Sequence, residues 1–182
     1  MEVMSLPGFV TSAAIKRYAL IDESGLYRYN LTRTWGSGER LLFIMLNPST
    51  ADGERDDATI RRCIGFAKQW KYGAIEVVNL FALRATDPME LINCRYRDGV
   101  SDPVGPDNNH HIRKAADRAE RIIAAWGSWA KPSFRDRAKA VTAMLRWHEK
   151  TLFCLKKSKG GDPCHPVRLP YDCKLEIWEG GH

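Results

Sequence analysis

Two asparagines and one histidine are the residues of this sequence whose types and positions are best suited to chemistry. Asn47 and Asn79 each follow or end an apolar run of strand length, and His165 follows a basic loop after another such run. An amide donates and accepts hydrogen bonds at once, and an imidazole can donate one to a developing anion. This set can bind a flat heterocycle by its edge and stabilise an anionic leaving group. It does not suit metal hydrolysis or chemistry that needs paired carboxylates.

The position of Asn47 follows from the residues around it. The apolar run 42–46 predicts a strand that is buried on both faces, as in a parallel sheet. Pro48 lacks a backbone N–H and restricts the preceding residue to extended geometry, so the strand must end there. Asn47 is therefore expected at the carboxyl end of a central strand, where open α/β sheets bind ligands. A purely structural role, as a cap or in an Asx turn, remains open.

Strands and helices alternate along the predicted chain. An antiparallel hairpin is expected over 17–36, with a turn at Glu23-Ser24-Gly25. Strands are predicted at 41–46, 74–81, 121–126 and 151–155, and helices at 58–71, 88–93, 109–119 and 133–149. This order predicts one α/β domain over residues 1–182, with three layers: a central, mainly parallel four-stranded sheet, flanking helices and an N-terminal β-hairpin. Residues 1–16 and 176–182 are expected to be loose termini.

Charged residues surround the start of the helix predicted at 58–71. Asp56 or Asp57 is expected to cap it, because a side-chain oxygen there can accept a hydrogen bond from the first turn. Arg61 and Arg62 follow within that turn. These residues are expected to form a capped, solvated helix face, and a salt-bridged wall of a ligand pocket is the alternative.

The bulk composition limits the possible classes of protein. The chain has 182 residues, a formal net charge of +6 and a pI of about 9.1, which fits binding to a polyanion without requiring it. Its five cysteines are odd in number and form no CxxC pair, which favours a reducing cytoplasm. No apolar run reaches the roughly 20 residues of a membrane helix. The spacing of Cys154, Cys164, His165 and Cys173 is irregular for zinc, so neither a metal nor another cofactor is expected. We expect a monomer.

Several motifs resemble the bacterial and phage family called domain of unknown function 1643, for which no activity is known. The resemblance covers most of the chain from about Tyr27 to Trp178. The motifs are Tyr27-Arg28-Tyr29, Trp35-Gly36, Leu46-Asn47-Pro48-Ser49-Thr50-Ala51-Asp52, Thr59-Ile60-Arg61-Arg62, Asn79-Leu80-Phe81-Ala82-Leu83-Arg84 and His165-Pro166.

A more distant resemblance is to the uracil-DNA glycosylase superfamily. Leu46-Asn47-Pro48-Ser49 is similar to its first motif, in the variant with Asn-Pro-Gly, although serine replaces the glycine. Val77-Val78-Asn79-Leu80 resembles the strand whose asparagine reads the base. Ala124-Ala125-Trp126-Gly127 resembles another strand end, and His165-Pro166 resembles the second catalytic motif. The single-strand-selective monofunctional branch pairs Asn in the first motif with His in the second, as here.

This resemblance implies a uracil-DNA glycosylase-like fold and hydrolysis of the N-glycosidic bond of a flipped base in DNA. Asn79 would bind the base edge, His165 would donate to the departing base, and Asn47 would hold the attacking water. An amide orients water but cannot take its proton. A modified base is at least as plausible a substrate as uracil, in a role in DNA repair or in defence against phage.

Other contacts implied by the resemblance complete the predicted site. Ser49 and Phe81 would lie beside the base, and Trp126 and Phe66 are further candidates for stacking. Phosphate contacts are expected from Lys156, Lys157, Lys159, Arg84 and Arg168. Two alternatives remain open: a nucleic-acid- or nucleotide-binding module that has lost catalysis, and a hydrolase that acts on free nucleotides.

Overall fold

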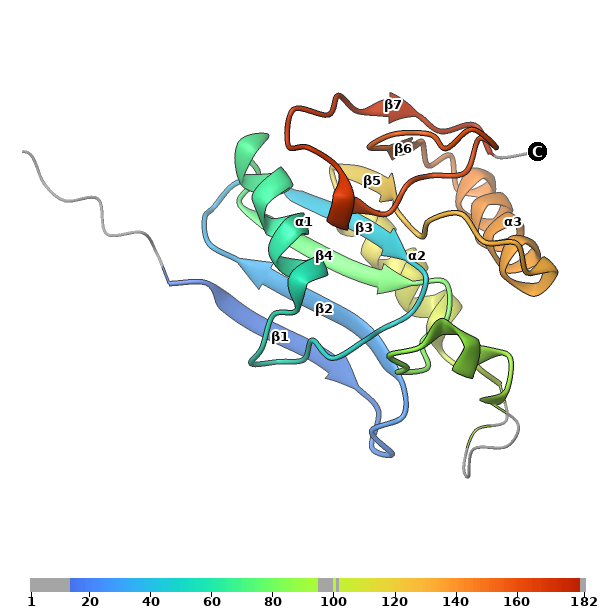
Figure 1. The fold of residues 1–182 in the computed structure, drawn as a ribbon. Coiled ribbons are helices and arrows are strands. Elements are labelled where there is room, and N and C mark those ends of the chain that lie inside the picture. Colours follow the sequence, from blue (N-terminus) through green and yellow to red (C-terminus); the bar gives the residue numbers. More distant parts are fainter. Residues whose placement is uncertain (1–13, 95–99, 101, 181–182) are drawn as a thin grey trace, which may run out of the picture.

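The computed structural model describes residues 14–94, 100 and 102–180, which form a seven-stranded sheet flanked by helices (Figure 1). The strands are β1 (Lys16–Ile21), β2 (Arg28–Thr34), β3 (Arg40–Met45), β4 (Ala74–Asn79), β5 (Arg121–Ala124), β6 (Leu152–Cys154) and β7 (Glu176–Ile177). The α-helices are α1 (Ala58–Gln69), α2 (Asn108–Arg118) and α3 (Pro132–Trp147), and the 3₁₀ helices are η1 (Pro88–Leu91) and η3 (Pro166–Arg168).

The strand order is β1-β2-β4-β3-β5-β6-β7. β4, β3, β5 and β6 run parallel to one another, whereas the pairs β1–β2, β2–β4 and β6–β7 are antiparallel. The expected α/β class is confirmed. The expected mainly parallel, four-stranded sheet is confirmed only for β4, β3, β5 and β6, because three of the six strand pairs are antiparallel and both the N-terminal hairpin and β7 join the sheet. Leu31 of β2 pairs with Val77 of β4, so the hairpin extends the sheet at one side.

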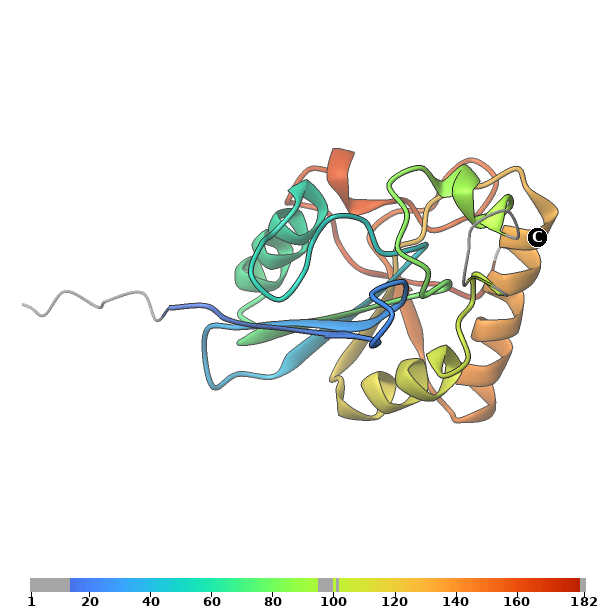
Figure 2. The same ribbon diagram turned by 90° about the horizontal axis from the view of Figure 1, so that it is seen from below.

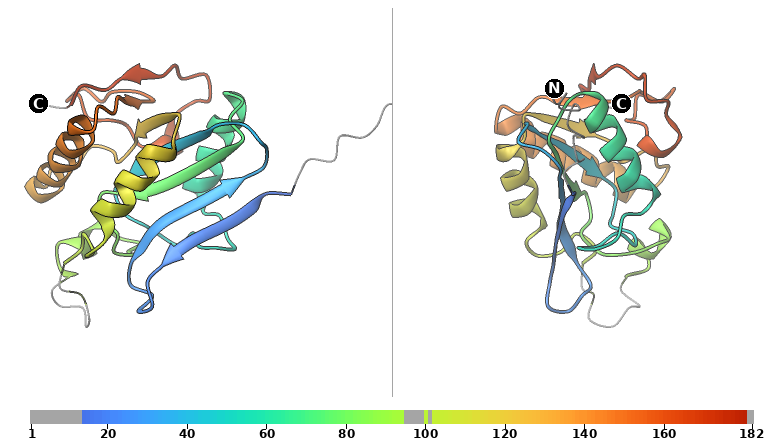
Figure 3. Two further views of the ribbon diagram at one scale, coloured as in Figure 1. Left: turned by 180° about the vertical axis from the view of Figure 1, so that it is seen from behind. Right: turned by 90° about the vertical axis from the view of Figure 1, so that its left-hand side faces the viewer.

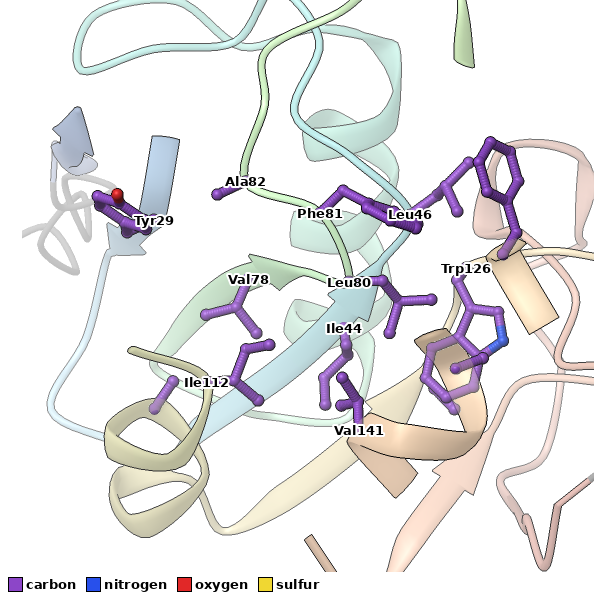
Figure 4. Close-up of a cluster of buried hydrophobic side chains, with 14 of the residues drawn as sticks. Tyr29, Ile44, Leu46, Val78, Leu80, Phe81, Ala82, Ile112, Trp126 and Val141 are labelled. Atoms are coloured by element: carbon purple, nitrogen blue, oxygen red, sulfur yellow. The ribbon is translucent and has the colours of Figure 1, made fainter. Parts of the chain in front are cut away.

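Helices cover both faces of the sheet (Figures 2 and 3). α1 lies on one face, and α2 and α3 lie on the other. Alternate residues of β3 belong to two cores: Leu41 and Phe43 pack with α1, whereas Ile44 packs with Val78 and with residues of α2 and α3 (Figure 4). A strand with helices on both faces buries every side chain, which explains the uninterrupted apolar run in the sequence.

The predicted elements before the C-terminal segment all occur, with ends that differ by a few residues. Asp57 is the cap of α1, since its Oδ1 accepts a 2.8 Å hydrogen bond from the Ile60 N–H. The helix expected at 88–93 is the single 3₁₀ turn η1, which starts with a capping box at Asp87. Residues 95–99 and 101, between η1 and α2, lie outside the described part of the chain.

The C-terminal segment is more ordered than expected. Residues 176–182 were expected to be loose, but β7 pairs with β6 and Trp178 is buried, with its ring 4.9 Å from that of Trp126. Neither η3 nor β7 was predicted. Residues 1–13 and 181–182 lie outside the described part. No described helix has the length and apolar character needed to cross a membrane.

Candidate functional site

A cavity of about 350 Å³ lies at the carboxyl edge of the parallel strands, where the sequence predicted a site. Asn47, Asn79 and His165 all line it, although they are far apart in the sequence. The other lining residues are Arg28, Met45, Leu46, Ser49, Asp57, Thr59, Ile60, Ala85, Thr86, Pro88, Trp126 and Trp129.

The strand order sets the order of side chains along this cavity. Because β2 is antiparallel to β4, its first residue, Arg28, lies at the same edge as the last residue of β4, Asn79. Asn47 follows β3, Trp126 follows β5, and His165 lies in the loop after β6. Arg28 and His165 therefore stand toward opposite ends of the cavity, with the two asparagines between them.

The amide of Asn47 is held in one orientation. Its Nδ2 donates to the carbonyl oxygens of Ala85, at 2.7 Å, and Pro48, at 3.0 Å. Carbonyl oxygens only accept hydrogen bonds, so the nitrogen must lie on this side of the amide. Both amide hydrogens are then used, and Oδ1 remains as the acceptor for a ligand or a water molecule.

Asn79 has a buried amide without a partner. The residue is 1% exposed, and neither its Nδ2 nor its Oδ1 forms a hydrogen bond to the described residues. Its backbone, in contrast, is held firmly, because Asn108 Nδ2 donates a 3.0 Å hydrogen bond to its carbonyl oxygen. Buried amides in folded proteins are nearly always paired. A donor and an acceptor are thus available side by side at the wall of the cavity.

His165 lies on the rim of the cavity and presents a hydrogen-bond donor. Its Nδ1 accepts a long, 3.4 Å hydrogen bond from the Val167 N–H, so the proton of the neutral ring is on Nε2. The pKa of His165 is lowered because the protein packed around the ring penalises its charged form, and the charge of Asp57 opposes this effect. Gly127, at φ +82°, ties the loop to the end of β5 through a 3.0 Å hydrogen bond from its N–H to the Pro163 carbonyl.

Two charged residues in the cavity wall were missed as site residues. Arg28 is buried, and burial lowers its pKa to about 10, although the charge of Asp57 acts in the opposite direction. Its Nη1 donates a 2.6 Å hydrogen bond to the Ala51 carbonyl, and its Nε has no described partner. Asp57 was expected to cap a solvated helix face, with a salt-bridged pocket wall as the alternative. It caps α1 and lines the cavity, but it forms no ion pair within the described residues. The cavity therefore contains a guanidinium and a carboxylate besides the predicted amides and imidazole.

A second arginine of β2 fixes the loop that carries part of this wall. Arg33 is fully buried and forms a 2.6 Å ion pair with Asp56. It also donates hydrogen bonds to the carbonyl oxygens of Asp52, at 2.6 Å, and Arg55, at 3.1 Å. The segment between β3 and α1 is thus anchored to the sheet by arginines, and it presents Asp57 to the cavity in a defined position.

The residues predicted to contact a base are only partly brought together. Ser49 lines the cavity, and so does Trp126. Phe81 does not line it: its ring packs in the core, 5.4 Å from that of Phe134 (Figure 4). Phe66 is also in the core. Trp129, whose Nε1 donates a 2.6 Å hydrogen bond to the Trp126 carbonyl, lines the cavity and was not predicted as a stacking residue.

None of the residues predicted to contact phosphate belongs to the cavity wall. The side chains of Lys156, Lys157 and Lys159 are exposed on the loop before His165, and Arg168 is exposed in η3. Arg84 lines an adjoining polar hollow of about 300 Å³, which shares Ser49, Ala85 and Thr86 with the main cavity. Its Nη1 donates a 3.1 Å hydrogen bond to the Gly25 carbonyl.

Within residues 14–94, 100 and 102–180, no three His, Cys, Asp or Glu side chains gather in a way that suits a metal ion. Comparison with curated proteins and with solved structures finds no match. The sequence profile of one family, described as "Protein of unknown function (DUF1643)", matches residues 28–167, a range that contains every wall residue of the cavity. Since this match spans more than half of the chain, the protein belongs to the DUF1643 family.

Proposed function

We propose that this protein is a DNA N-glycosylase that removes a modified or unusual base. The observation that carries the proposal is the amide of Asn79, which is buried beside a cavity with its donor and its acceptor both unpaired. Leaving such a group without partners costs about 1–3 kcal/mol. A nucleobase edge with adjacent acceptor and donor atoms would restore both hydrogen bonds, as happens when a flipped base is read by its edge.

The other two predicted residues supply what the reaction needs. His165 presents Nε2–H and would stabilise negative charge on the departing base, because a preorganised donor costs little to reorganise. Asn47 presents Oδ1, which would accept a hydrogen from a water molecule and aim its oxygen at C1′ of the sugar. These roles require that the target nucleotide leaves the base stack, at a cost of a few kcal/mol.

The arrangement of strands supports a uracil-DNA glycosylase-like fold. Four neighbouring strands run parallel, and the segments Leu46-Asn47-Pro48-Ser49 and His165-Pro166 approach the same edge of the sheet. The antiparallel strands at both sides are additions to that pattern. Fold likeness alone does not define an activity, so the proposal depends on the chemistry of the cavity.

The test is release of free base from DNA. Oligonucleotides that carry diverse modified bases are incubated with the protein, and released bases are identified by mass spectrometry. Loss of the His165 donor in His165→Ala is expected to lower the rate about 10²–10³-fold. Asn47→Ala is expected to lower it about 10²-fold, since the water is no longer aimed. His148→Ala, which removes an exposed histidine that does not line the cavity, is the matched control.

The alternatives give different results in the same assay. DNA binding without release of any tested base would favour a binding module that has lost catalysis. Release of base from free nucleotides, without affinity for DNA, would favour a nucleotide hydrolase.

A further inference from the structure

Asp57 is the one carboxylate among the described residues that line the cavity. The predicted set of two amides and an imidazole contains no group that takes a proton from water at neutral pH, apart from the imidazole, which is assigned to the leaving base. A carboxylate in the same cavity supplies the missing proton acceptor. The sequence did not indicate a proton acceptor at this position, because the role of Asp57 as a helix cap is enough to explain the residue.

The structural role of Asp57 uses only part of its carboxylate. Oδ1 accepts the 2.8 Å hydrogen bond from the Ile60 N–H. Within the described part of the chain, Oδ2 forms neither a hydrogen bond nor an ion pair. The cap fixes the side chain, and the second oxygen remains available to a ligand or a water molecule at the cavity wall.

The charged and titratable groups that face Asp57 come from three elements. Its negative charge acts on Arg28 of β2, on Cys63 of α1 and on His165 of the loop before η3. In both Arg28 and His165 it opposes a lowering of the pKa by burial. No ion pair within the described residues neutralises Asp57. Its negative charge therefore acts on Arg28 and on His165, which stand toward opposite ends of the cavity.

We propose that Asp57 is the general base that takes the proton of the attacking water, an inference that rests on the proposed glycosylase function. The water would donate one hydrogen to Asn47 Oδ1 and the other to Asp57 Oδ2. Its oxygen forms a bond to C1′ of the sugar, and the C1′–N bond breaks, with its electron pair leaving on the base. The proton passes from water to Asp57, and His165 and Asn79 stabilise the base anion. Asp57 then gives this proton to solvent and the base anion takes one from solvent, so the carboxylate is restored and the base leaves as a neutral molecule.

The buried, unpaired amide of Asn79 is an independent sign that this cavity takes a ligand. It would hold the base edge, while Asn47 and Asp57 would hold the water on the sugar side. The two asparagines and Asp57 thus divide the site into a part that recognises the base and a part that activates water.

The decisive variant is Asp57→Asn, which keeps an oxygen to cap α1 and removes the proton acceptor. On a DNA from which the wild-type protein releases base, kcat is expected to fall about 10²–10⁴-fold, with KM and DNA affinity unchanged. Asp117→Asn, an exposed carboxylate on α2, is the control and is expected to keep the wild-type kcat. Urea unfolding of both variants verifies that they are folded.

A second variant separates proton transfer from structure. Glycine is also a favourable N-cap residue, so Asp57→Gly leaves space beside a capped helix. Sodium formate is expected to restore part of its activity, as an external carboxylate, and to leave wild-type kcat unchanged. A wild-type kcat in Asp57→Asn, or a low activity of Asp57→Gly that formate does not raise, would overturn the role of Asp57 while the glycosylase function stands. Absence of base release by the wild-type protein overturns the function and, with it, this inference.

Discussion

Asn108 holds the backbone of Asn79 and leaves the side chain of Asn79 unpaired. The Nδ2 of Asn108 donates 3.0 Å hydrogen bonds to the carbonyl oxygens of Asn79 and Leu80, just where β4 leaves the sheet. Asn108 is fully buried at the start of α2. One asparagine thus meets the structural needs of the strand end, which frees the other for the cavity.

Asn108→Ala is therefore expected to destabilise the fold. The carbonyl of Leu80 keeps a 2.7 Å hydrogen bond from Arg137 Nε, whereas that of Asn79 loses its side-chain donor. An unsatisfied buried carbonyl costs about 1–3 kcal/mol of unfolding free energy, measured by urea denaturation. Asn93→Ala, at an exposed position, is the control and is expected to change it by less than about 0.5 kcal/mol. Equal stabilities of the two variants would contradict the positioning role of Asn108.

Asn79→Leu is expected to separate stability from function. Leucine has a similar size and removes a donor and an acceptor that have no partner among the described residues. The free energy of unfolding is expected to stay the same or rise by up to about 1–3 kcal/mol, because the cost of burying the unpaired amide disappears. Base release is expected to be lost.

Urea denaturation and the base-release assay on the same preparation test both halves of this prediction. A marked loss of stability in Asn79→Leu would mean that the amide is needed by the fold itself. Asn30→Leu is a useful comparison, since the buried Asn30 amide donates to Glu76 and its loss is expected to destabilise the protein.

The convergence of Asn47 and Asn79 on one cavity could be predicted because a local rule places both of them, whereas His165 lies farther along the loop after β6. An apolar run that stops at a polar residue marks a strand end, and parallel strands bring their carboxyl ends to one edge. Arg28 obeys no such rule. It reaches that edge because β2 pairs antiparallel with β4, and this pairing joins residues at least 40 positions apart without any local signal.

Asp57 and Phe81 illustrate two other limits of the sequence. The sequence predicted the helix cap at Asp57, but whether Asp57 reaches the cavity depends on where α1 packs on the sheet. Phe81 follows β4 by two residues, where the strand alternation no longer applies, and its ring packs against Phe134 of α3. β7 contains only two residues, which is too short for a recognisable pattern.

The pKa of His165 gives a prediction for pH dependence. The folded protein lowers this pKa, so the unfolded chain binds the proton more tightly. The contribution of His165 to stability is therefore complete above about pH 6.5 and is lost as the pH falls through the folded-state value. Removing the negative charge in Asp57→Asn is expected to lower the pKa further, because that charge opposes the lowering.

An NMR titration of the imidazole resonances measures this shift directly. His111 is the internal reference. Burial is the main cause that lowers its pKa, and the charge of His110 acts in the same direction. Its titration is expected to be the same in Asp57→Asn as in the wild-type protein. An unchanged or raised pKa of His165 in Asp57→Asn would show that the two groups do not interact across the cavity.

The lysine loop is expected to set affinity for DNA and not the rate of base release. Backbone hydrogen bonds hold this loop in place, among them one of 2.8 Å from the Cys164 N–H to the Lys156 carbonyl. The side chains of Lys156, Lys157 and Lys159 are exposed and do not line the cavity. Each lysine that contacts a phosphate contributes about 0.9 to the slope of log affinity against log salt concentration. Replacing all three with glutamine is expected to weaken binding and flatten that slope, with kcat at saturating DNA retained. The matched control replaces the exposed Lys16, Lys114 and Lys139 with glutamine. If both triple variants flatten the salt slope equally, DNA affinity depends on the net charge of the protein and not on this loop.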